Sequence, residues 1–177
     1  MWKKVATKTL LEHPRVTIVE DEVLLPNGHR AKYLRFENLQ DGVVVLAKND
    51  QNEFLILKEY SYPPNEWLYQ FPGGLCFDNE KREDGANREL MEETNLKANY
   101  LKILGSFYTT ARRSSVKTYV ILAREFSEKI TESDIEEEIE MVWVTEEEID
   151  KLIKEDRFKN GPTLSAWCIY KSNKFSN

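Results

Sequence analysis

The chain has 177 residues, 41 % of them hydrophobic, so it can bury a core as one compact domain with at most a small extension. Its formal net charge of −6 at pH 7 excludes a general DNA- or RNA-binding protein, because such proteins need a basic face to contact phosphates. The longest apolar run, Gly42 to Ala47, is too short to cross a membrane, and residues 1–10 lack the apolar middle of a signal peptide, so we expect a cytoplasmic protein without nucleic-acid or membrane partners.

The first patterned segment, residues 15–39, predicts an antiparallel β-hairpin. Apolar and polar residues alternate on both sides of Pro26-Asn27-Gly28, and Asn and Gly readily supply the positive φ angles of a tight turn. Residues 42–62 repeat the pattern as two β-rich runs around a polar turn at residues 49–52. A soft boundary near Gln40 therefore separates an N-terminal β extension, residues 1–40, from a main domain, residues 41–177.

From Asp84 the apolar residues change to helical spacing, which predicts a helix entered from a long loop. Strand-like segments follow at residues 101–110, 117–126 and 140–145, then a helix whose Thr145 and Glu148 stand in capping-box register, and a last helix near Pro162. This order predicts an α+β fold with a mixed β-sheet sandwiched between α-helices. Trp67 and Trp143 are expected in the core, and Cys76 and Cys168 as reduced, unpaired thiols.

The predicted helix gathers like charge on one face. Residues three and four positions apart share a helix face, so Glu89, Glu92 and Glu93 project together. Such carboxylates repel one another unless a cation lies among them, and oxygen-only ligands of this kind suit Mg²⁺ or Mn²⁺. Arg88, one turn before Glu92, can neutralise or orient part of the cluster. The alternative is a solvated acidic helix face, and "RELMEE" taken alone leaves both open.

The wider spacing favours the metal site. The fixed positions are, in order, Gly74, Glu80, Arg88, Glu89, Leu90, Glu92, Glu93 and Leu96. This spacing resembles the Nudix box, Gly-x5-Glu-x7-Arg-Glu-apolar-x-Glu-Glu-x-Gly-apolar, at every fixed position except the last glycine, which is Asn95 here. After glycine, asparagine best tolerates the left-handed conformation at a helix end, so we expect the helix to stop there.

The resemblance implies the Nudix fold and hydrolysis of nucleoside diphosphates linked to a further moiety. It implies that Glu89 and Glu93 are the principal ligands of Mg²⁺ or a substituting Mn²⁺, that Glu92 is a further ligand or an orienting catalytic carboxylate, and that the carbonyl of Gly73 is an extra ligand. Glu93 would then be catalytic as well. Gly74, Glu80 and Arg88 would support the loop and helix of the box. Metal ions would bind the diphosphate oxygens and lower the pKa of a bound water for in-line attack on phosphorus.

Beyond the box, most of the chain is similar to the ADP-ribose pyrophosphatase branch of this family. In that branch an N-terminal hairpin segment helps to form a homodimer whose partner contributes to the substrate site, a part that residues 1–40 would take. Trp2 and Tyr33 stand near the positions that stack adenine between aromatic side chains, with packing at an interface as the alternative for each. The branch also implies an acidic metal ligand or general base before the strand that contains Trp143. Glu137 is the best match, with Glu136 and Glu138 as rivals.

Two segments depart from the branch. The strand before the box carries Ser61 and Tyr62 where the branch usually has an arginine that holds phosphate. The loop after the box helix, residues 108–117, lacks the usual Pro-Ser-Pro-Gly and glutamate. Arg112 and Arg113 would replace the phosphate grip, because a guanidinium offers two donors to phosphate oxygens; two surface arginines are the alternative.

The sequence thus predicts a Mg²⁺-dependent pyrophosphatase of nucleoside diphosphate sugars, and most specifically of ADP-ribose, with AMP and ribose 5-phosphate as products. The alternatives are a hydrolase of another nucleotide sugar, such as GDP-mannose, or of a dinucleotide polyphosphate, and a catalytically silent nucleotide-binding module. The intact carboxylate cluster counts against the silent module, because a cluster kept only for folding would gain stability from losing its like charges.

Overall fold

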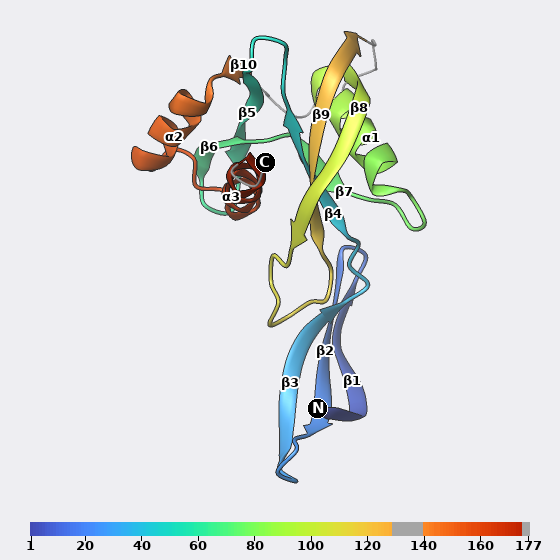
Figure 1. Cartoon of the computed structure of the whole chain (residues 1–177). Helices are drawn as coiled ribbons and strands as arrows, with labels where there is room; N and C mark the ends of the chain where they lie inside the picture. The colour runs from blue at the N-terminus through green and yellow to red at the C-terminus, as the bar shows by residue number, and fades with distance from the viewer. Residues whose placement is uncertain (129–139, 175–177) are drawn as a thin grey trace. The chain divides into compact units, whose positions relative to one another are not determined.

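The computed structural model describes residues 1–128 and 140–174, and the chain divides into two compact units. Unit 1 consists of Met1–Gln40 and Tyr108–Val116, and unit 2 of Asp41–Phe107 and Lys117–Asn177. A loop from the middle of the chain therefore belongs to the same unit as the N-terminal strands (Figure 1).

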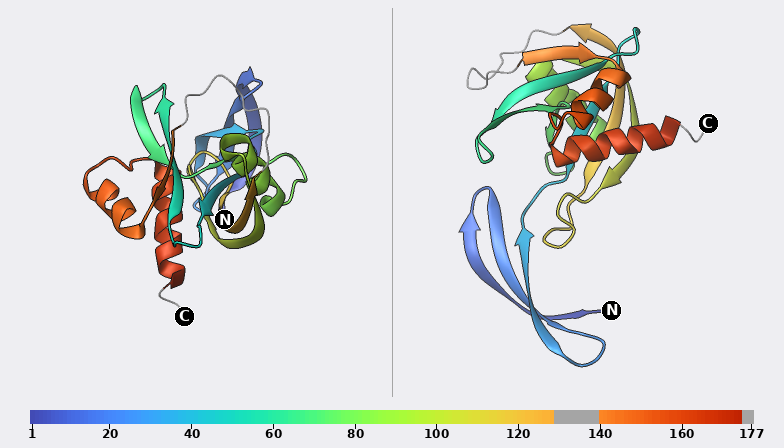
Figure 2. Two further views of the ribbon diagram at one scale, coloured as in Figure 1. Left: turned by 90° about the horizontal axis from the view of Figure 1, so that it is seen from above. Right: turned by 90° about the vertical axis from the view of Figure 1, so that its left-hand side faces the viewer.

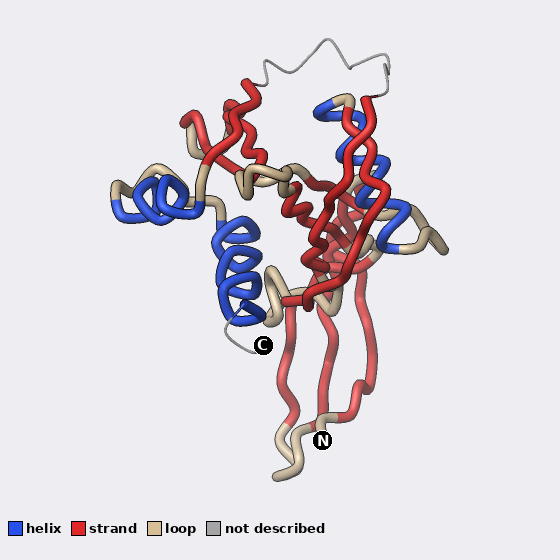
Figure 3. The backbone as a smooth tube through the Cα atoms, turned by 45° about the horizontal axis from the view of Figure 1, so that its top comes forward, coloured by secondary structure: helices blue, strands red, loops and turns tan. Residues whose placement is uncertain are grey.

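Unit 1 is a three-stranded antiparallel sheet in the order β1-β2-β3. Its strands are β1 (Lys3–His13), β2 (Val16–Leu24) and β3 (Arg30–Glu37). The turn between β2 and β3 contains Gly28 with a φ of 81°, as an Asn-Gly turn requires. The predicted hairpin is confirmed, and β1 adds a strand that the sequence pattern did not predict. In Figure 3 this unit contains strands and loops only.

The loop Tyr108–Val116 is fastened to β3 by hydrogen bonds within unit 1. The backbone N–H of Phe36 donates to the carbonyl of Arg113 at 2.7 Å, and the hydroxyl of Tyr33 donates to the carbonyl of Arg112 at 2.7 Å. These bonds explain why a segment so distant in sequence belongs to this sheet.

The main sheet of unit 2 is mixed and lies between helices. It has the order β7-β4-β9-β8, in which β4 (Gly42–Ala47) runs parallel to β9 (Thr118–Glu128) and antiparallel to β7 (Gly73–Leu75), while β8 (Leu96–Phe107) is antiparallel to β9. On one side Val44 and Leu46 share a core with α3 (Gly161–Lys174); on the other Val43 and Val45 share one with α1 (Arg82–Thr94). Burial on both faces explains why "GVVVLA" is apolar throughout. The predicted sandwich is confirmed (Figure 2).

A second, antiparallel sheet has the order β10-β5-β6, from β10 (Glu140–Val144), β5 (Phe54–Ser61) and β6 (Glu66–Gln70). The polar turn at residues 49–52 forms, with Asn49 Oδ1 accepting a bond from Glu53 N at 2.9 Å. The strands on either side of it, β4 and β5, nevertheless enter different sheets and share only the bridge between Lys48 and Phe54. β4 pairs with β9 over six residues and β5 pairs with β10 over five, and an alternating pattern cannot reveal such distant partners.

The two tryptophans expected in the core have different environments. Trp143 is partly buried against the core that contains Leu90 of α1, with its ring 5.9 Å from that of Phe126. Trp67 is 48 % exposed on β6, so its predicted place in the core was wrong. As an outer strand of its sheet, β6 leaves Trp67 beside Tyr60, with ring centroids 5.8 Å apart.

The helix ends follow their local signals. Asn95 follows α1 with a φ of 59°, in the left-handed region, and its N–H donates to the carbonyl of Met91 at 3.0 Å. At the start of α2 (Glu146–Lys154), Thr145 and Glu148 form both bonds of the predicted capping box.

Both cysteines are free, as expected: Cys76 is buried and Cys168 is exposed. None of the helices within the described ranges is long and apolar enough to cross a membrane. The cytoplasmic location stays a prediction.

Exchange of Asn95 for alanine is expected to lower the free energy of unfolding by about 1 kcal/mol, because alanine is strained in the left-handed region. Exchange for glycine, which has no such strain, should leave the protein closer to wild type. Denaturant titration of the three proteins measures the difference. Equal stability of the alanine and glycine variants would contradict a left-handed residue at this helix end.

Candidate active site

Two glycines of β7 allow the backbone to approach both β4 and α1 closely. Gly73 has a φ of 154°, and a Cβ built there would collide with the backbone carbonyl of Val43 in β4. A Cβ on Gly74 would overlap the carboxylate of Glu89 on α1. A side chain in place of Gly73 would meet the backbone of β4, and one in place of Gly74 would displace the carboxylate of Glu89, which explains the Pro-Gly-Gly turn before the box helix.

Arg88 lies among the carboxylates of the box. Its Nη1 donates to Glu89 Oε1 at 2.8 Å and to Glu92 Oε2 at 3.1 Å. Its Nε and Nη2 donate to the two carboxylate oxygens of Glu80, both at 3.2 Å. Nη2 also donates to the carbonyl of Leu75 at 2.6 Å. One guanidinium therefore compensates three carboxylates and ties α1 to the end of β7.

The loop between β7 and α1 folds around the same arginine. The ring of Phe77 lies 4.0 Å from the guanidinium of Arg88, within cation–π range. The backbone N–H of Phe77 donates to Glu80 Oε2 at 2.8 Å. The hydrogen bond from Arg88, helped by that backbone bond, holds the pKa of Glu80 below its usual range. Glu80 is therefore ionised at neutral pH and braces the loop.

The three glutamates on the outer face of α1 differ in their environment. Glu93 Oε2 accepts a hydrogen bond from the backbone N–H of Gly73 at 3.0 Å. The side chain of Glu89 is 14 % exposed, and its burial raises its pKa, an effect that Arg88 opposes. The side chain of Glu92 is 55 % exposed. Two carboxylates are thus held near β7, and the third reaches solvent.

This donor set suits a hard divalent cation. The oxygens of Glu89, Glu92, Glu93 and the carbonyl of Gly73 are the ligand types that Mg²⁺ and Mn²⁺ prefer. In the present arrangement Arg88 supplies the positive charge, and in residues 1–128 and 140–174 no three His, Cys, Asp or Glu side chains converge closely enough to enclose an ion. The partly buried charge of Glu89, given space by Gly74, is what a cation would compensate.

A second ion pair, which sequence reasoning missed, anchors the loop of the box. Arg82 Nη2 lies 2.6 Å from Asp41 Oδ2, and the guanidinium stands 5.1 Å from the ring of Tyr119. The carbonyl of Asp41 accepts from Cys76 N, and its Oδ1 accepts from Lys117 N, both at 2.8 Å. Because Arg82 occupies an unrestricted position of the box and Asp41 precedes the box altogether, the spacing gave no signal for this pair.

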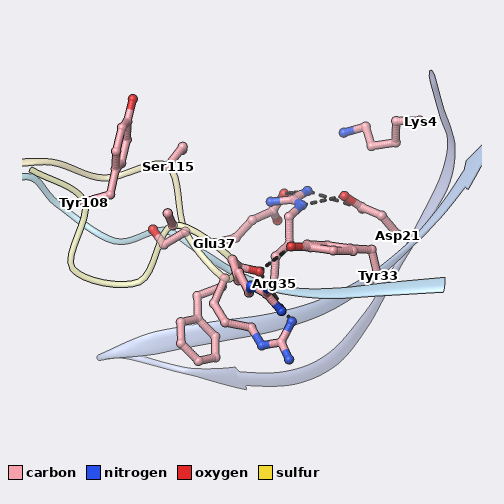
Figure 4. A pocket seen from close by; sticks show the side chains of 12 residues that line it. Lys4, Asp21, Tyr33, Arg35, Glu37, Tyr108 and Ser115 are labelled. Carbon is pink, nitrogen blue, oxygen red and sulfur yellow. Dashed lines mark hydrogen bonds and ion pairs between the residues drawn. The ribbon is translucent and has the colours of Figure 1, made fainter. Parts of the chain in front are cut away.

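The four residues predicted to contact substrate lie together in unit 1. The rings of Trp2 and Tyr33 are 5.9 Å apart at 78°, so they meet edge to face rather than as parallel plates around a base. The guanidinium of Arg113 stands 6.0 Å from the ring of Tyr33. Tyr33, Arg112 and Arg113 line a pocket of about 710 Å³ (Figure 4). Their contact with substrate stays a prediction.

An ion-pair network forms part of the lining of this pocket, and sequence reasoning missed it too. Arg35 Nε donates to Asp21 Oδ2 and Arg35 Nη2 to Glu37 Oε1, each at 2.5 Å. The hydroxyl of Thr7 donates to Asp21 Oδ1 at 2.6 Å. Burial alternates along β2, and Asp21 lies on the buried face together with Val19. An acidic residue between the buried Val19 and Val23 was the available signal.

The general base predicted on the loop before β10 has no described position. Glu137 and its rivals Glu136 and Glu138 lie outside the described residues. Their assignment therefore rests on the resemblance alone.

Comparisons with known proteins give a matching family model and similar chains. A family model described as NUDIX domain matches residues 38–167. An ADP-ribose pyrophosphatase of Bacillus subtilis (strain 168) is 29 % identical over 166 residues, which are 93 % of this chain and 89 % of that protein. The ADP compounds hydrolase NudE of Escherichia coli (strain K12) is 24 % identical over 151 residues, which are 85 % of this chain and 81 % of that protein.

A crystal structure of an ADP compounds hydrolase matches with a TM-score of 0.88. The match covers 97 % of this chain and 92 % of the other, at 22 % identity. At this identity the likeness shows the fold.

Replacement of Asp21 by asparagine is expected to lower the free energy of unfolding at pH 7 by about 2 kcal/mol, since a charged hydrogen-bond partner of Arg35 is lost. The bond from Arg35 holds the pKa of Asp21 below its usual range, so the ionised form adds stability above the unfolded-state pKa and loses it as the pH falls through the folded-state value.

The difference between wild type and Asp21→Asn should therefore narrow below about pH 4. Denaturant titrations across the acid range measure it. A difference that stays constant down to acid unfolding would show that this charge does not stabilise the fold.

Proposed function

The chain belongs to the NUDIX family, and from that premise we propose that it hydrolyses the diphosphate bond of a nucleoside diphosphate sugar with Mg²⁺ as cofactor. It is a Nudix hydrolase similar to ADP-ribose pyrophosphatases, and Nudix hydrolases generally use a divalent metal. The substrate we propose is ADP-ribose, with AMP and ribose 5-phosphate as products. The proposal includes the cytoplasmic location expected from the sequence.

One observation carries this proposal: α1 holds three glutamates on one face beside a strand that has no side chains at the point of contact. Like charges so close together lower stability unless something compensates them. Arg88 donates to Glu89 and Glu92, and Glu93 accepts a hydrogen bond from the backbone of Gly73. Such an arrangement favours a bound cation and an anionic substrate.

We assign separate roles to the residues of the box. Glu89 and Glu93 hold the cation, and Glu92 and the carbonyl of Gly73 complete the set of oxygen donors. When bound, the cation supplies positive charge for the diphosphate oxygens and lowers the pKa of a water molecule. Arg88 positions Glu89 and Glu92, and Glu137 is the proposed base that takes the proton from the attacking water. No covalent link between enzyme and substrate is needed.

The names of the relatives support an ADP-containing substrate. One relative is an ADP-ribose pyrophosphatase and another an ADP compounds hydrolase, so the ADP moiety is common to both while the second moiety is not. Hydrolysis of another nucleotide sugar or a dinucleotide polyphosphate is therefore the second candidate, which the altered loop Tyr108–Val116 also favours.

Incubation with Mg²⁺ and ADP-ribose is expected to yield AMP and ribose 5-phosphate, identified by mass spectrometry. The variant Glu93→Gln should lower kcat at least about a hundredfold, because it loses a charged ligand, and excess chelator should abolish turnover in wild type.

The matched control is Asp84→Asn, which removes an exposed negative charge from the same helix and should leave kcat unchanged.

GDP-mannose, NADH and diadenosine polyphosphates are assayed in parallel. Cleavage of one of these compounds without cleavage of ADP-ribose would show that ADP-ribose is not the substrate. No turnover of any compound with Mg²⁺ or Mn²⁺ would contradict the proposal that the protein hydrolyses a diphosphate bond.

We further propose that unit 1 joins two copies of the chain. All residues of this unit are described, and they form one layer of sheet and contain no helix. Its edge strand β1 is exposed along its whole length, including Val5 at 47 %, Leu10 at 48 % and Leu11 at 50 %. An exposed edge strand with apolar side chains favours association with another chain.

Sedimentation equilibrium is expected to give about 42 kDa, twice the chain mass of 20.8 kDa. The double variant Val5→Lys, Leu11→Lys should sediment as a monomer, because charge on this surface opposes association. Met141→Lys, at an exposed apolar residue of unit 2, is the control and should remain dimeric. A monomeric wild type would rule the proposal out.

A further inference from the structure

Arg82, in the first turn of α1, is bonded to segments that lie far from it in sequence. Its Nη2 donates to Asp41 Oδ2, just before β4, at 2.6 Å, and its guanidinium stands 5.1 Å from the ring of Tyr119 in β9. Its Nη1 donates to the backbone carbonyl of Glu80 at 3.1 Å. The side chains of Arg82 and Asp41 are only 28 % and 23 % exposed, so water and salt screen this ion pair less than a surface pair.

Asp41 is bonded to three segments at once. In addition to its bond from Arg82, its Oδ1 accepts from the backbone N–H of Lys117, and its carbonyl accepts from that of Cys76, both at 2.8 Å. Asp41 and Lys117 are the residues at which the chain enters unit 2, first after Gln40 and again after Val116. One residue therefore joins both of these entries to the loop of the box and to the start of α1.

The loop between β7 and α1 packs closely on the first turns of the helix. Cys76 in this loop is buried. A Cβ built on Gly85 of α1 would stand 3.0 Å from Cys76 Sγ and 3.0 Å from Glu80 Oε2, which is tighter than an ordinary contact. Little space is left between loop and helix, so a shift of the loop away from α1 would expose the thiol of Cys76.

Glu80 is held at both of its polar ends by arginines. Arg82 binds its backbone carbonyl, and Arg88 binds both oxygens of its carboxylate at 3.2 Å. Arg88 in turn donates to Glu89 and Glu92. A series of hydrogen bonds therefore runs from Arg82 through Glu80 to the guanidinium that orients two of the proposed metal ligands. Groups that orient metal ligands influence metal affinity without touching the metal.

We propose that Asp41 and Arg82 are positioning residues: they hold the loop of the box against α1 and thereby set the affinity of the glutamates for a divalent cation. The part that concerns the cation rests on the proposed function, which takes Glu89, Glu92 and Glu93 as ligands. Neither positioning residue occupies a fixed position of the box, so the motif spacing does not include their contribution.

Thiol labelling of Cys76 reports the position of the loop without metal or substrate. The exposed Cys168 is first replaced by serine, and the rate at which a thiol reagent modifies Cys76 in excess chelator then measures how often the loop leaves the helix. Asp41→Asn and Arg82→Ala are each expected to raise this rate at least about tenfold, because a hydrogen bond between charged groups is lost. Arg82→Lys keeps the charge and should raise it less.

Calorimetric titration with Mn²⁺ tests the link to the metal ligands. Asp41→Asn and Arg82→Ala should each weaken binding about tenfold, as expected when groups that orient metal ligands are lost. In hydrolysis both variants should need more Mg²⁺ for the half-maximal rate and reach nearly the wild-type kcat at saturating Mg²⁺, a recovery that a misfolded protein would not show. Because coupling is reciprocal, Mn²⁺ should also slow the labelling of Cys76 in protein that is otherwise wild type.

The matched control is Asp150→Asn, which breaks another partly exposed ion pair of unit 2, between α2 and α3. There Asp150 Oδ2 accepts from Lys171 Nζ at 3.1 Å. This variant should be less stable in denaturant titration, yet keep the wild-type rate of Cys76 labelling and the wild-type affinity for Mn²⁺. An Asp41→Asn protein that is unchanged in either of these two measurements would overturn the proposal.

The two measurements also separate this proposal from the proposed function. If the wild type binds neither Mn²⁺ nor Mg²⁺, the proposed function fails, while the labelling rates still decide whether the ion pair holds the loop. If the wild type binds the cation and hydrolyses ADP-ribose, but the variants bind Mn²⁺ as tightly as the wild type, only the positioning role fails.

Discussion

The guanidinium of Arg88 is the group on which the box depends. It holds Glu80, Glu89 and Glu92 at hydrogen-bond distance and also binds the carbonyl of Leu75, so the helix, the loop and β7 share one cation. Without it, partly buried carboxylates would face one another uncompensated, which costs more than an exposed ion pair contributes. A cluster of like charge is thereby kept in a folded protein.

The features that the sequence predicted well have local causes. Asn95 ends α1 in the left-handed conformation, and Thr145 pairs with Glu148 at the start of α2, because each depends on residues within one turn. Strand partners depend on distant residues. β4 and β5 were both predicted as strands, yet their alternation could not show that β4 pairs with β9 and β5 with β10. Trp67 was misplaced for a related reason, since nothing local shows that its side of β6 stays uncovered.

Long-range pairing also explains what was missed around the two candidate sites. The ion pair of Asp41 and Arg82 joins residues that no motif links, and the attachment of Arg113 to Phe36 joins the two halves of unit 1. The residues of the box could be named because their spacing resembles a family. Lys4 and Asp21 lie outside that spacing. Only the folding of the unit 1 strands against the loop brings them to one pocket.

Unit 1 is discontinuous in the chain, and this limits how the gene can be recombined. A single crossover near Gln40 would pair the N-terminal strands of one homologue with the Tyr108–Val116 loop of another. The loop would then meet a β3 strand that was not fitted to it, and would lose its bond to the Tyr33 hydroxyl wherever the other homologue has no tyrosine there. Functional chimaeras should therefore exchange both segments at once, and natural substitutions in the two segments should be inherited together.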